Sequence, residues 1–593
     1  MPDPKRVARP EPEEEHSHAS EDTPPDRRAG FHPPPLRDPA RRRTQRARES
    51  GLNLAAPHLA LARSESFYEL GESLRERGPE ILQAAQDPAN LMLGGTALAG
   101  GLAAALAAPK LAGGCWRLLH KALYADPGGV LLGTAKGGWG VTRPVYLSLA
   151  DRLMHLQVVA PTGGAKTSLF EWIFCQDLKS DLTTISVENI GDFGTRAVSR
   201  ALLAGKPVYL FDPTVKNTLK WNPLAGEPEE AAERAVSTFS SSAKSGSEEF
   251  FKTFNGSLFR HTIVALHAYG RRVGRRIHMG DVWEFLNDRR FRNEVLDASS
   301  SRDGKEGVRV TALNLPRKTR KWFENRYFKE WTHRQREEFT AGLFGAIDEL
   351  LGRSVVEHAL CPEGDEPALD LDEAVSSGGF VFLSVPQGLL GETSARTLST
   401  WLIMSLMQAI RRRGEGGRPI SLFIDEAHSM LGHASSDAAR EFTGFTTHAR
   451  HHSTILQLSY QSFSLLPLEL RFSLDSNARN RMIAGGLGPR DAAEARAIMG
   501  SVEEEVTDRR RMYRGLLSAP GGYSVGTREM ERPRLSEEEI RGIPRGYWNL
   551  ARVKNGRDQE PILVRAGRAP RLPVEFKPER ALVAGREGEG AVA

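Results

Sequence analysis

One short segment constrains the fold of this chain more than any other: an apolar run that leads through small residues to a Lys-Thr pair. It reads Leu156-Gln157-Val158-Val159-Ala160-Pro161-Thr162-Gly163-Gly164-Ala165-Lys166-Thr167. The run predicts a buried strand, and a helical pattern follows from Ser168 onward. A strand, a small-residue loop and a helix N-terminus in this order form a phosphate-binding loop, whose lysine adds positive charge and whose threonine ligates Mg²⁺. We therefore expect an α/β nucleotide-binding domain that uses ATP and Mg²⁺.

The residues expected around the nucleotide phosphates are Thr162, Gly163, Gly164, Ala165, Lys166, Thr167 and Ser168. Two positions depart from the usual glycine pattern of such loops. Ala160 stands where a first glycine closes the loop, which is a mild change. Ala165 stands where a glycine usually precedes the lysine, because the backbone there approaches phosphate without a Cβ atom. We expect Ala165 to slow or weaken the chemistry without abolishing it.

A second apolar run ends in two acidic residues. It reads Leu422-Phe423-Ile424-Asp425-Glu426-Ala427-His428. Ligands of α/β sheets bind at the carboxyl ends of the strands, where this run delivers its carboxylates. We expect Asp425 to hold Mg²⁺ together with Thr167, and Glu426 to polarise the attacking water. Strands that end in Asp-Glu are common, so this interpretation depends on the phosphate-binding loop.

The letters Asp-Glu-Ala-His are also those of a DEAH-box helicase. Such helicases place the lysine and the acidic pair far closer together than Lys166 and Asp425, which are separated by residues 167–424. The chain also has no Ser-Ala-Thr motif and no arginine-rich closing motif after the acidic pair. The helicase interpretation is therefore disfavoured.

The remaining sequence predicts how the chain is divided. Apolar runs predict strands at His155–Ala160, Thr183–Val187, Val208–Phe211, Phe380–Val385, Ile420–Ile424 and Thr454–Tyr460. Between 226 and 370 helical spacings replace them, for example at Val282, Phe285 and Leu286. The first fifty residues hold almost no large apolar side chains, which predicts a disordered tail. Ser536 and Glu539 form a capping-box pattern, so a short helix is expected to start there.

An uncharged stretch, Leu91–Ala108, is just long enough to be a candidate membrane segment. It is mostly Ala and Gly, which insert only marginally, so a buried helix is the alternative. The expected division is a disordered tail at 1–50, an N-terminal region at 51–120 with the candidate membrane segment 91–108, a nucleotide-binding domain in two parts at 121–225 and 371–575, an all-α domain at 226–370, and a C-terminal tail at 576–593.

The charge of the chain says little about its binding partners, and its cysteines indicate the redox compartment. The net charge of +5 comes from 80 basic and 75 acidic residues, an excess that permits nucleic-acid contact without arguing for it. Two basic runs that contain aromatic residues, 317–322 and 509–514, could track a DNA backbone, although a solvated charged surface is the commoner explanation. The three cysteines lie far apart, which fits a reducing compartment without disulfides or a zinc site.

Three histidines, His448, His451 and His452, have a spacing that could gather them on one helix face as metal ligands. No acidic or cysteine residue stands near them in the sequence to complete a site. Metal binding is therefore disfavoured here.

A series of segments in a fixed order resembles the coupling proteins of bacterial conjugation and type IV secretion, a TraG/TraD-like family in the FtsK/HerA superfamily of P-loop ATPases. The segments are Leu210–Pro213, Trp221–Leu224, Phe382–Pro386, Tyr460–Leu465, Asn477–Arg481, Gly485–Leu487, Ala492–Ala495 and Pro533–Pro544. The resemblance covers roughly residues 130 to 570. One departure is Val187–Asp192, which lacks the lysine of the family's Asp-Pro-Lys-Gly stretch.

The resemblance implies a RecA-like P-loop domain with an all-α insertion domain, assembled as a ring hexamer on the cytoplasmic side of the bacterial inner membrane. It places Gln461 near the γ-phosphate as a sensor. A ring motor also needs an arginine from the neighbouring subunit. Arg450, Arg479 and Arg481 are the candidates, and we favour Arg479 or Arg481.

Three functions follow from these observations. The leading one is an ATPase that moves single-stranded DNA, or a relaxase-type nucleoprotein, to the components of a type IV secretion channel. The second is an ATP-binding platform that docks substrates with little or no hydrolysis, which Ala165 and the missing lysine near Glu188 keep open. The third is a cytoplasmic DNA pump of the FtsK/HerA type, which a membrane anchor at 91–108 would disfavour.

Overall fold

The computed structural model describes residues 128–572, except 138–141, 191–192, 217, 243–253, 300–307, 365, 432–436 and 514–519. The candidate membrane segment 91–108 and both expected tails lie outside the described residues. Among the residues that are described, no helix is long and apolar enough to cross a membrane.

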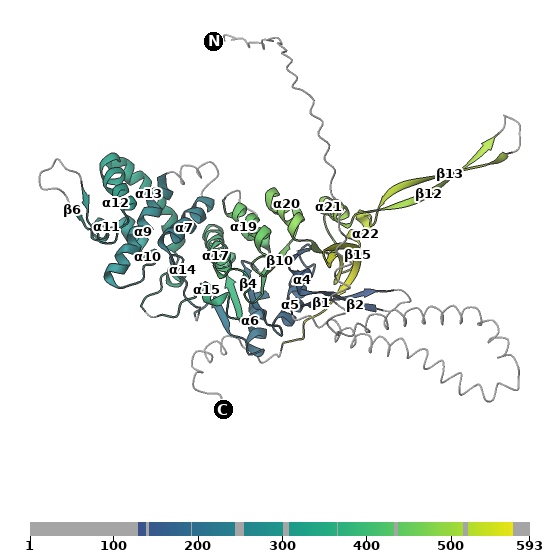
Figure 1. The fold of residues 1–593 in the computed structure, drawn as a ribbon, viewed down its shortest axis with the longest axis horizontal. Helices are drawn as coiled ribbons and strands as arrows, with labels where there is room; N and C mark the ends of the chain where they lie inside the picture. Colours follow the sequence, from purple (N-terminus) through teal and green to yellow (C-terminus); the bar gives the residue numbers. More distant parts are fainter. Residues whose placement is uncertain are drawn as a thin grey trace, which may run out of the picture. The chain divides into compact units, whose positions relative to one another are not determined.

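An eleven-stranded sheet organises the described residues, in the order β2-β1-β15-β14-β11-β3-β10-β9-β4-β8-β5 (Figure 1). The strands from β11 to β5 run parallel to one another. They are β11 (Asn480–Ile483), β3 (Leu156–Val159), β10 (Thr454–Tyr460), β9 (Ile420–Ile424), β4 (Thr183–Glu188), β8 (Phe380–Ser384) and β5 (Val208–Phe211). Most are buried along their whole length, which explains why most of their sequences are predominantly apolar. The six strands predicted from the sequence are confirmed to within one residue at each end.

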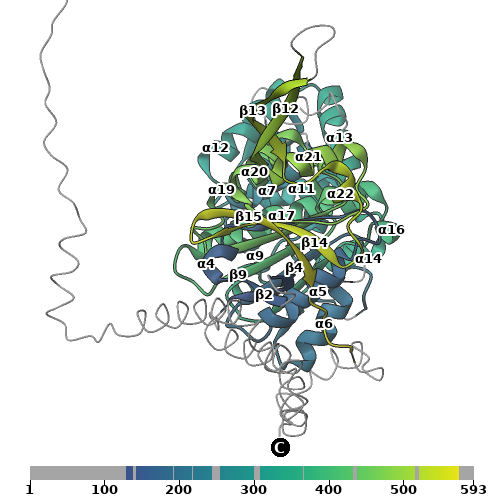
Figure 2. The same ribbon diagram turned by 90° about the vertical axis from the view of Figure 1, so that its right-hand side faces the viewer.

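Four further strands extend the sheet in antiparallel fashion beyond β11, and the sequence analysis did not predict them. They are β14 (Tyr547–Lys554), β15 (Arg557–Ala566), β1 (Val130–Lys136) and β2 (Thr142–Leu147). Figure 2 looks onto this part of the sheet. Asn555 and Gly556 join β14 to β15 with φ values of 52° and 78°. Two positive φ values suit a tight hairpin turn, and Asn-Gly is the sequence that supplies them most readily.

Helices cover both faces of the sheet (Figure 1). On one face α5 (Lys166–Asp177) and α6 (Phe193–Leu203) pack a cluster of aromatic side chains against the strands. Phe170 and Phe174 of α5 meet Phe423 and Phe380 edge-on, with ring centroids 5.3 and 4.8 Å apart respectively. On the other face lie α17 (Glu392–Arg413), α19 (Asp437–His448) and α20 (Leu468–Asn477).

Helices dominate residues 226–370. They are α7 (Pro228–Ser242), α9 (Gly256–Val273), α10 (Met279–Asn287), α11 (Arg289–Leu296), α12 (Arg317–Lys321), a π-helix (Trp322–Glu330), α13 (His333–Leu351) and α14 (Ser354–Leu360). The expectation of no strand here is wrong in detail, because β6 (Ala298–Ser299) pairs with β7 (Arg309–Val310). The region also shares its core with α17, as Phe239 of α7 packs edge-on against Trp401 at 5.6 Å. A separate all-α domain is therefore not confirmed.

Short elements complete the described chain. They are α4 (Leu149–Arg152), α15 (Leu371–Ala374), α16 (Gln387–Leu390), α18 (Ala427–Leu431), a 3-10 turn (Phe463–Leu465), α21 (Pro489–Met499) and α22 (Glu537–Arg541). Two long strands, β12 (Ser501–Tyr513) and β13 (Pro520–Pro533), pair only with each other. The predicted capping box at the start of α22 is confirmed, because Glu539 N donates to Ser536 Oγ at 3.2 Å and Ser536 N donates to Glu539 Oε2 at 2.7 Å.

Candidate nucleotide-binding site

The phosphate-binding loop joins the carboxyl end of β3 to the first turn of α5, as the sequence predicts. Lys166 is the first residue of the helix and is only 5% exposed, whereas Thr167 is half-buried. Thr162, Gly163 and Ser168 are exposed at the mouth of the loop. The helix N-terminus therefore presents its free backbone amides to the space above β3, where an anion binds well.

Gly164 lies so close to the Ala160 side chain that it has no room for a Cβ atom. A Cβ atom on Gly164 would lie 2.6 Å from Ala160 Cβ and 2.9 Å from Pro161 O. Gly164 N donates to Pro161 O at 2.9 Å, which closes the loop as a tight turn. The methyl group of Ala160 thus fills space that Gly164 leaves empty, so the substitution at the first glycine position is structurally compensated.

Ala165 adopts a left-handed backbone, with φ 72° and ψ 24°. The usual preference for glycine at this position therefore has a backbone cause in addition to the close approach of phosphate. A left-handed conformation costs a residue with a Cβ atom about 1 kcal/mol. Ala165 is also the N-cap of α5 and offers no side-chain hydrogen bond to the helix amides. The strain at Ala165 lies directly beside Lys166.

The acidic pair and the lysine meet in space although they are far apart in sequence. Lys166 Nζ lies 3.2 Å from Glu426 Oε1 and donates to Ala160 O at 2.9 Å. Strand β10 lies between β3 and β9 in the sheet. Tyr460, the last residue of β10, is in register with Val159, so Gln461 follows at the edge between the loop and the acidic pair. The structure thus gathers Lys166, Glu426 and Gln461 at one edge of the sheet.

Asp425 is almost completely buried, with 2% of its surface exposed. Its Oδ1 accepts hydrogen bonds from Ser459 Oγ and, at 3.1 Å, from Glu426 N. Burial raises the pKa of Asp425, and the hydrogen bond from Ser459 offsets part of this increase. A buried carboxylate with a raised pKa gains from a bound cation. Asp425, together with the Thr167 hydroxyl, therefore fits an Mg²⁺ site.

Two contacts of the acidic pair were not foreseen from the sequence. Ser459 Oγ bonds Asp425 and also accepts from Glu426 N at 3.2 Å. His428 Nδ1 lies 3.3 Å from Glu426 Oε2. Glu426 itself has φ 50°, so the backbone turns sharply after β9 and aims the carboxylate at Lys166. No motif signals Ser459, whose role depends on β10 lying next to β9.

The three candidate arginines lie at the opposite edge of the sheet. Arg479 N donates to Met154 O just before β3 begins, and the Arg450 guanidinium lies against the sulfur of Met154. The Arg479 side chain pairs with Asp558 at 2.8 Å, and Arg481 pairs with Asp475 at 3.2 Å. The structure therefore does not bring any of them to the phosphate-binding loop of their own chain.

Glu188 and Asn189, in the segment that lacks the family's lysine, make hydrogen bonds to two helices. Glu188, the last residue of β4, accepts from Gly194 N at 3.0 Å, and Asn189 Oδ1 accepts from Ser399 Oγ at 2.7 Å. Both side chains are buried. Glu188 and Asn189 therefore hold α6 and α17 against the end of the sheet.

The basic run 317–322 forms α12 and the start of the π-helix. Thr319 faces the core, and the Trp322 ring stacks on His261 with centroids 4.7 Å apart. Trp322 is therefore half-buried with its ring stacked against His261, whereas Arg317 and Lys321 are exposed. The second run, 509–514, lies mostly on β12.

The three histidines do not share a helix face, because α19 ends at His448 and the other two follow in a turn. Within the described ranges no group of three or more His, Cys, Asp or Glu side chains could hold a metal ion.

Comparison with known proteins identifies the fold. No protein-family model matches the sequence, and no curated protein matches it. The solved structure of the bacterial conjugative coupling protein TrwBdeltaN70, in its unbound form, matches with a TM-score of 0.52 and 15% identity, over 76% of this chain and 91% of that one. TrwB with a non-hydrolysable ATP analogue matches with a TM-score of 0.52, 14% identity and coverages of 76% and 92%. TrwB with ADP and Mg²⁺ matches with a TM-score of 0.51, 14% identity and coverages of 74% and 90%.

These identities are low, so the likeness is one of fold. It agrees with the motif order in the sequence and with the geometry of the loop and the acidic pair. The described part of the chain has the P-loop fold of the conjugative coupling protein TrwB.

Proposed function

We propose that this chain is an ATPase that moves DNA or a nucleoprotein toward a type IV secretion channel. The observation that carries the proposal is the ion pair between Lys166 and Glu426, 3.2 Å apart at the mouth of a phosphate-binding loop. The two residues come from distant parts of the chain, and a lysine and a carboxylate that meet beside a phosphate-binding loop are the groups that nucleotide hydrolysis uses. TrwB, which shares the fold, has been solved with an ATP analogue and with ADP and Mg²⁺.

The chemistry follows from the groups at the site. Lys166 and the amides of the loop bind the β- and γ-phosphates, and Gln461 faces the γ-phosphate. Thr167 and Asp425 would hold Mg²⁺, which neutralises charge on the phosphates when it is bound. Glu426 accepts a proton from water as the water oxygen bonds to the γ-phosphorus and the bond to the bridging oxygen breaks. ADP and inorganic phosphate are the products.

Glu426 must leave Lys166 before it can act as a base. In the described conformation its Oε1 is held by Lys166 and its Oε2 lies beside His428. A bound phosphate chain competes for Lys166, because a phosphate carries more charge than one carboxylate. Nucleotide binding therefore frees Glu426 to polarise water.

The cargo and the surroundings belong to the same proposal. We infer that the chain assembles as a ring hexamer, that the cargo is single-stranded DNA or a relaxase-type nucleoprotein, and that the ring acts at the inner membrane beside channel components. The proposal is supported by the motif order and by the shared fold.

An ATP-binding docking platform is the second candidate. The positive φ of Ala165 favours it, because strain in the loop beside Lys166 slows hydrolysis. The same chain would then recruit substrates in its nucleotide-bound state without turnover.

Two substitutions test the proposal. Glu426→Gln should bind ATP nearly as the parent does, while its turnover falls by at least about a hundredfold, since a general base is lost. Lys166→Ala should lose affinity for ATP on the order of a hundredfold, because a charge-assisted contact to the phosphates is removed. Steady-state hydrolysis and ATP binding are measured with and without single-stranded DNA. Glu469→Gln, an exposed position on α20, is the matched control and should behave as the parent does.

The outcomes separate the two candidates. A Glu426→Gln protein that hydrolyses ATP at the parental rate would show that Glu426 is not the base. A parent that binds ATP but turns over no faster than Glu426→Gln, even with DNA, would favour the docking platform.

A further inference from the structure

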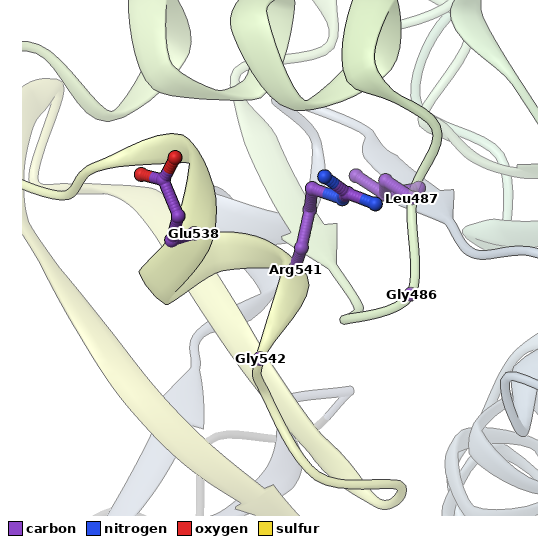
Figure 3. A pocket seen from close by; sticks show the side chains of 5 residues that line it. All are labelled: Gly486, Leu487, Glu538, Arg541 and Gly542. Carbon is purple, nitrogen blue, oxygen red and sulfur yellow. The ribbon is translucent and has the colours of Figure 1, made fainter.

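A pocket lies beside the phosphate-binding loop, and none of the residues assigned above lines it. Its volume is about 370 Å³, and Gly486, Leu487, Glu538, Arg541 and Gly542 line it (Figure 3). This volume lies within the range of roughly 300–1,000 Å³ that is typical of small-molecule sites. The pocket is formed where the turn after β11 meets α22.

The turn after β11 touches the phosphate-binding loop. Ala484 N donates to Val159 O at 2.9 Å, which continues the pairing of β11 with β3. A Cβ atom on Gly486 would lie 3.5 Å from Pro161 Cγ. The wall of the pocket that Gly486 forms therefore lies next to Pro161 of the loop.

Helix α22 closes the pocket from the other side. Gly486 N donates to Arg541 O at 2.9 Å, and a Cβ atom on Gly485 would lie 2.1 Å from Ile543 O. The absence of a side chain at position 485 thus lets the segment after α22 pack directly on the turn. In Figure 3 the Arg541 side chain extends from α22 toward Leu487.

The order of the strands in the sheet indicates which part of a bound nucleotide would reach this pocket. Asp425 and Glu426 follow β9, and β9 lies on the β10 side of β3. The γ-phosphate must face Glu426, where the water attacks. The opposite end of the nucleotide then points away from β9, toward β11, and β11 leads directly into the pocket.

The lining has the chemistry of a nucleoside site. Leu487 and the glycine backbone offer an apolar wall, and a guanidinium plane stacks well on a planar base. The Glu538 carboxylate can accept hydrogen bonds from ribose hydroxyl groups. Both charged side chains are exposed at the mouth, so they are accessible to a ligand.

We propose that this pocket holds the nucleoside, that is the base and the ribose, of the bound nucleoside triphosphate, with Arg541 stacked on the base and Glu538 at the ribose. The proposal rests on the proposed ATP-binding function of the neighbouring loop. It adds a second contact area to the site, built from the C-terminal segment rather than from the loop. Nucleotide binding then also holds the turn after β11 and α22 together.

The test compares two ligands that share the phosphate chain but differ in the nucleoside. Binding of MgATP and of magnesium tripolyphosphate to the full-length protein is measured by calorimetry, for the parent, Arg541→Ala, Arg545→Ala and Lys166→Ala. Arg545 is exposed and does not line the pocket, so Arg545→Ala is the matched control. Thermal unfolding of each variant checks that the fold is retained.

The expected result is that Arg541→Ala weakens ATP binding by about tenfold and leaves tripolyphosphate binding unchanged. Arg545→Ala should match the parent, and Lys166→Ala should weaken both ligands. Unchanged ATP binding in Arg541→Ala would overturn the nucleoside assignment, and so would an equal loss of both ligands. A parent that binds neither ligand would instead refute the ATP-binding function, and the inference with it.

Discussion

Ala165 is the residue at which the sequence of this chain conflicts most clearly with the conformation it adopts. Its φ of 72° belongs to the left-handed region, which glycine occupies without a steric penalty. The strain is local, because it concerns one peptide unit between Gly164 and Lys166. It matters for function because those neighbours form the phosphate-binding loop.

Replacing Ala165 with glycine should relieve this strain. We expect Ala165→Gly to raise ATP turnover by up to about tenfold, since about 1.4 kcal/mol of strain corresponds to that factor. The free energy of unfolding should stay the same or rise by about 1 kcal/mol, since glycine is favoured at this φ. Steady-state hydrolysis with single-stranded DNA and denaturant unfolding check both expectations.

A second alanine provides the control. Ala341 is exposed in the middle of α13, where the backbone is right-handed, so Ala341→Gly should lose about 1 kcal/mol of stability with no change in turnover. Equal losses of stability in both variants would mean that Ala165 is not strained.

Asp425, which is expected to hold Mg²⁺, lowers the stability of the nucleotide-free protein. Burial raises its pKa, so the folded protein holds the charged form less readily than the unfolded chain does, and the ionised carboxylate destabilises the nucleotide-free fold at neutral pH. Asp425→Asn keeps the Oδ1 acceptor for Ser459 and Glu426 N. At pH 7 and without nucleotide it should therefore be more stable than the parent by about 1 kcal/mol.

The same substitution removes the carboxylate that is expected to hold Mg²⁺. Stabilisation of Asp425→Asn by MgATP should be largely lost, as measured by the shift of the thermal unfolding midpoint on addition of ligand. A variant that is less stable than the parent without nucleotide, and still stabilised by MgATP, would contradict both statements.

At the scale of elements, the β12–β13 hairpin stands apart from the sheet. Its two strands pair only with each other, from Ser501 opposite Pro533 to Tyr513 opposite Pro520. The residues at its base, 501–504 and 527–533, are exposed. An isolated two-stranded hairpin contributes little stability to the domain that carries it.

Shortening this hairpin should therefore leave the fold intact. We expect that replacing residues 503–531 with an Asn-Gly turn shifts the thermal unfolding midpoint by less than about 2 °C, because the strands pair only with each other and residues 503–504 and 527–531 are exposed. The replacement also removes the basic run 509–514. Salt-dependent binding of single-stranded DNA should then weaken, and the slope of log affinity against log salt should become shallower.

Two results would contradict this account. A large drop in the unfolding midpoint would show that the hairpin supports the core. An unchanged salt slope, with the fold intact, would show that the basic run makes no contact with DNA.

At the scale of the whole molecule, the positions of the candidate arginines indicate whether they can act in their own subunit or only in a neighbouring one. Arg450, Arg479 and Arg481 lie at the amino ends of the parallel strands, whereas Lys166 and Glu426 lie at the carboxyl ends. If one of these arginines acts at a phosphate chain, the phosphate chain belongs to a neighbouring subunit.

Mixing two inactive proteins tests this. Lys166→Ala combined with Arg479→Ala or Arg481→Ala should regain part of the parental turnover, because one subunit's intact pocket meets the other's intact arginine. Lys166→Ala combined with Glu426→Gln is the control. Both of those residues belong to the same pocket of one chain, so mixing should restore nothing. Absence of rescue with Arg450, Arg479 and Arg481 alike would remove the trans-arginine from the mechanism.

The sequence by itself predicted six of the seven parallel strands, all except β11, and the residues proposed for the candidate site. Strands buried on both faces are rich in apolar residues, so six of them were predicted to within a residue. The phosphate-binding loop and the acidic pair could also be predicted from the sequence, because each consists of a few consecutive residues. The antiparallel strands β14 and β15 were missed, although Asn555-Gly556 is a strong hairpin signal.

Only the tertiary structure decided which of these local features meet. That Lys166 pairs with Glu426, that Ser459 bonds Asp425, and that the arginines lie at the far edge all follow from the order of the strands in the sheet. The nearness of Arg541 to the phosphate-binding loop has the same origin, since α22 packs on the turn after β11. Strand order depends on contacts between segments hundreds of residues apart, and no local pattern of residues specifies them.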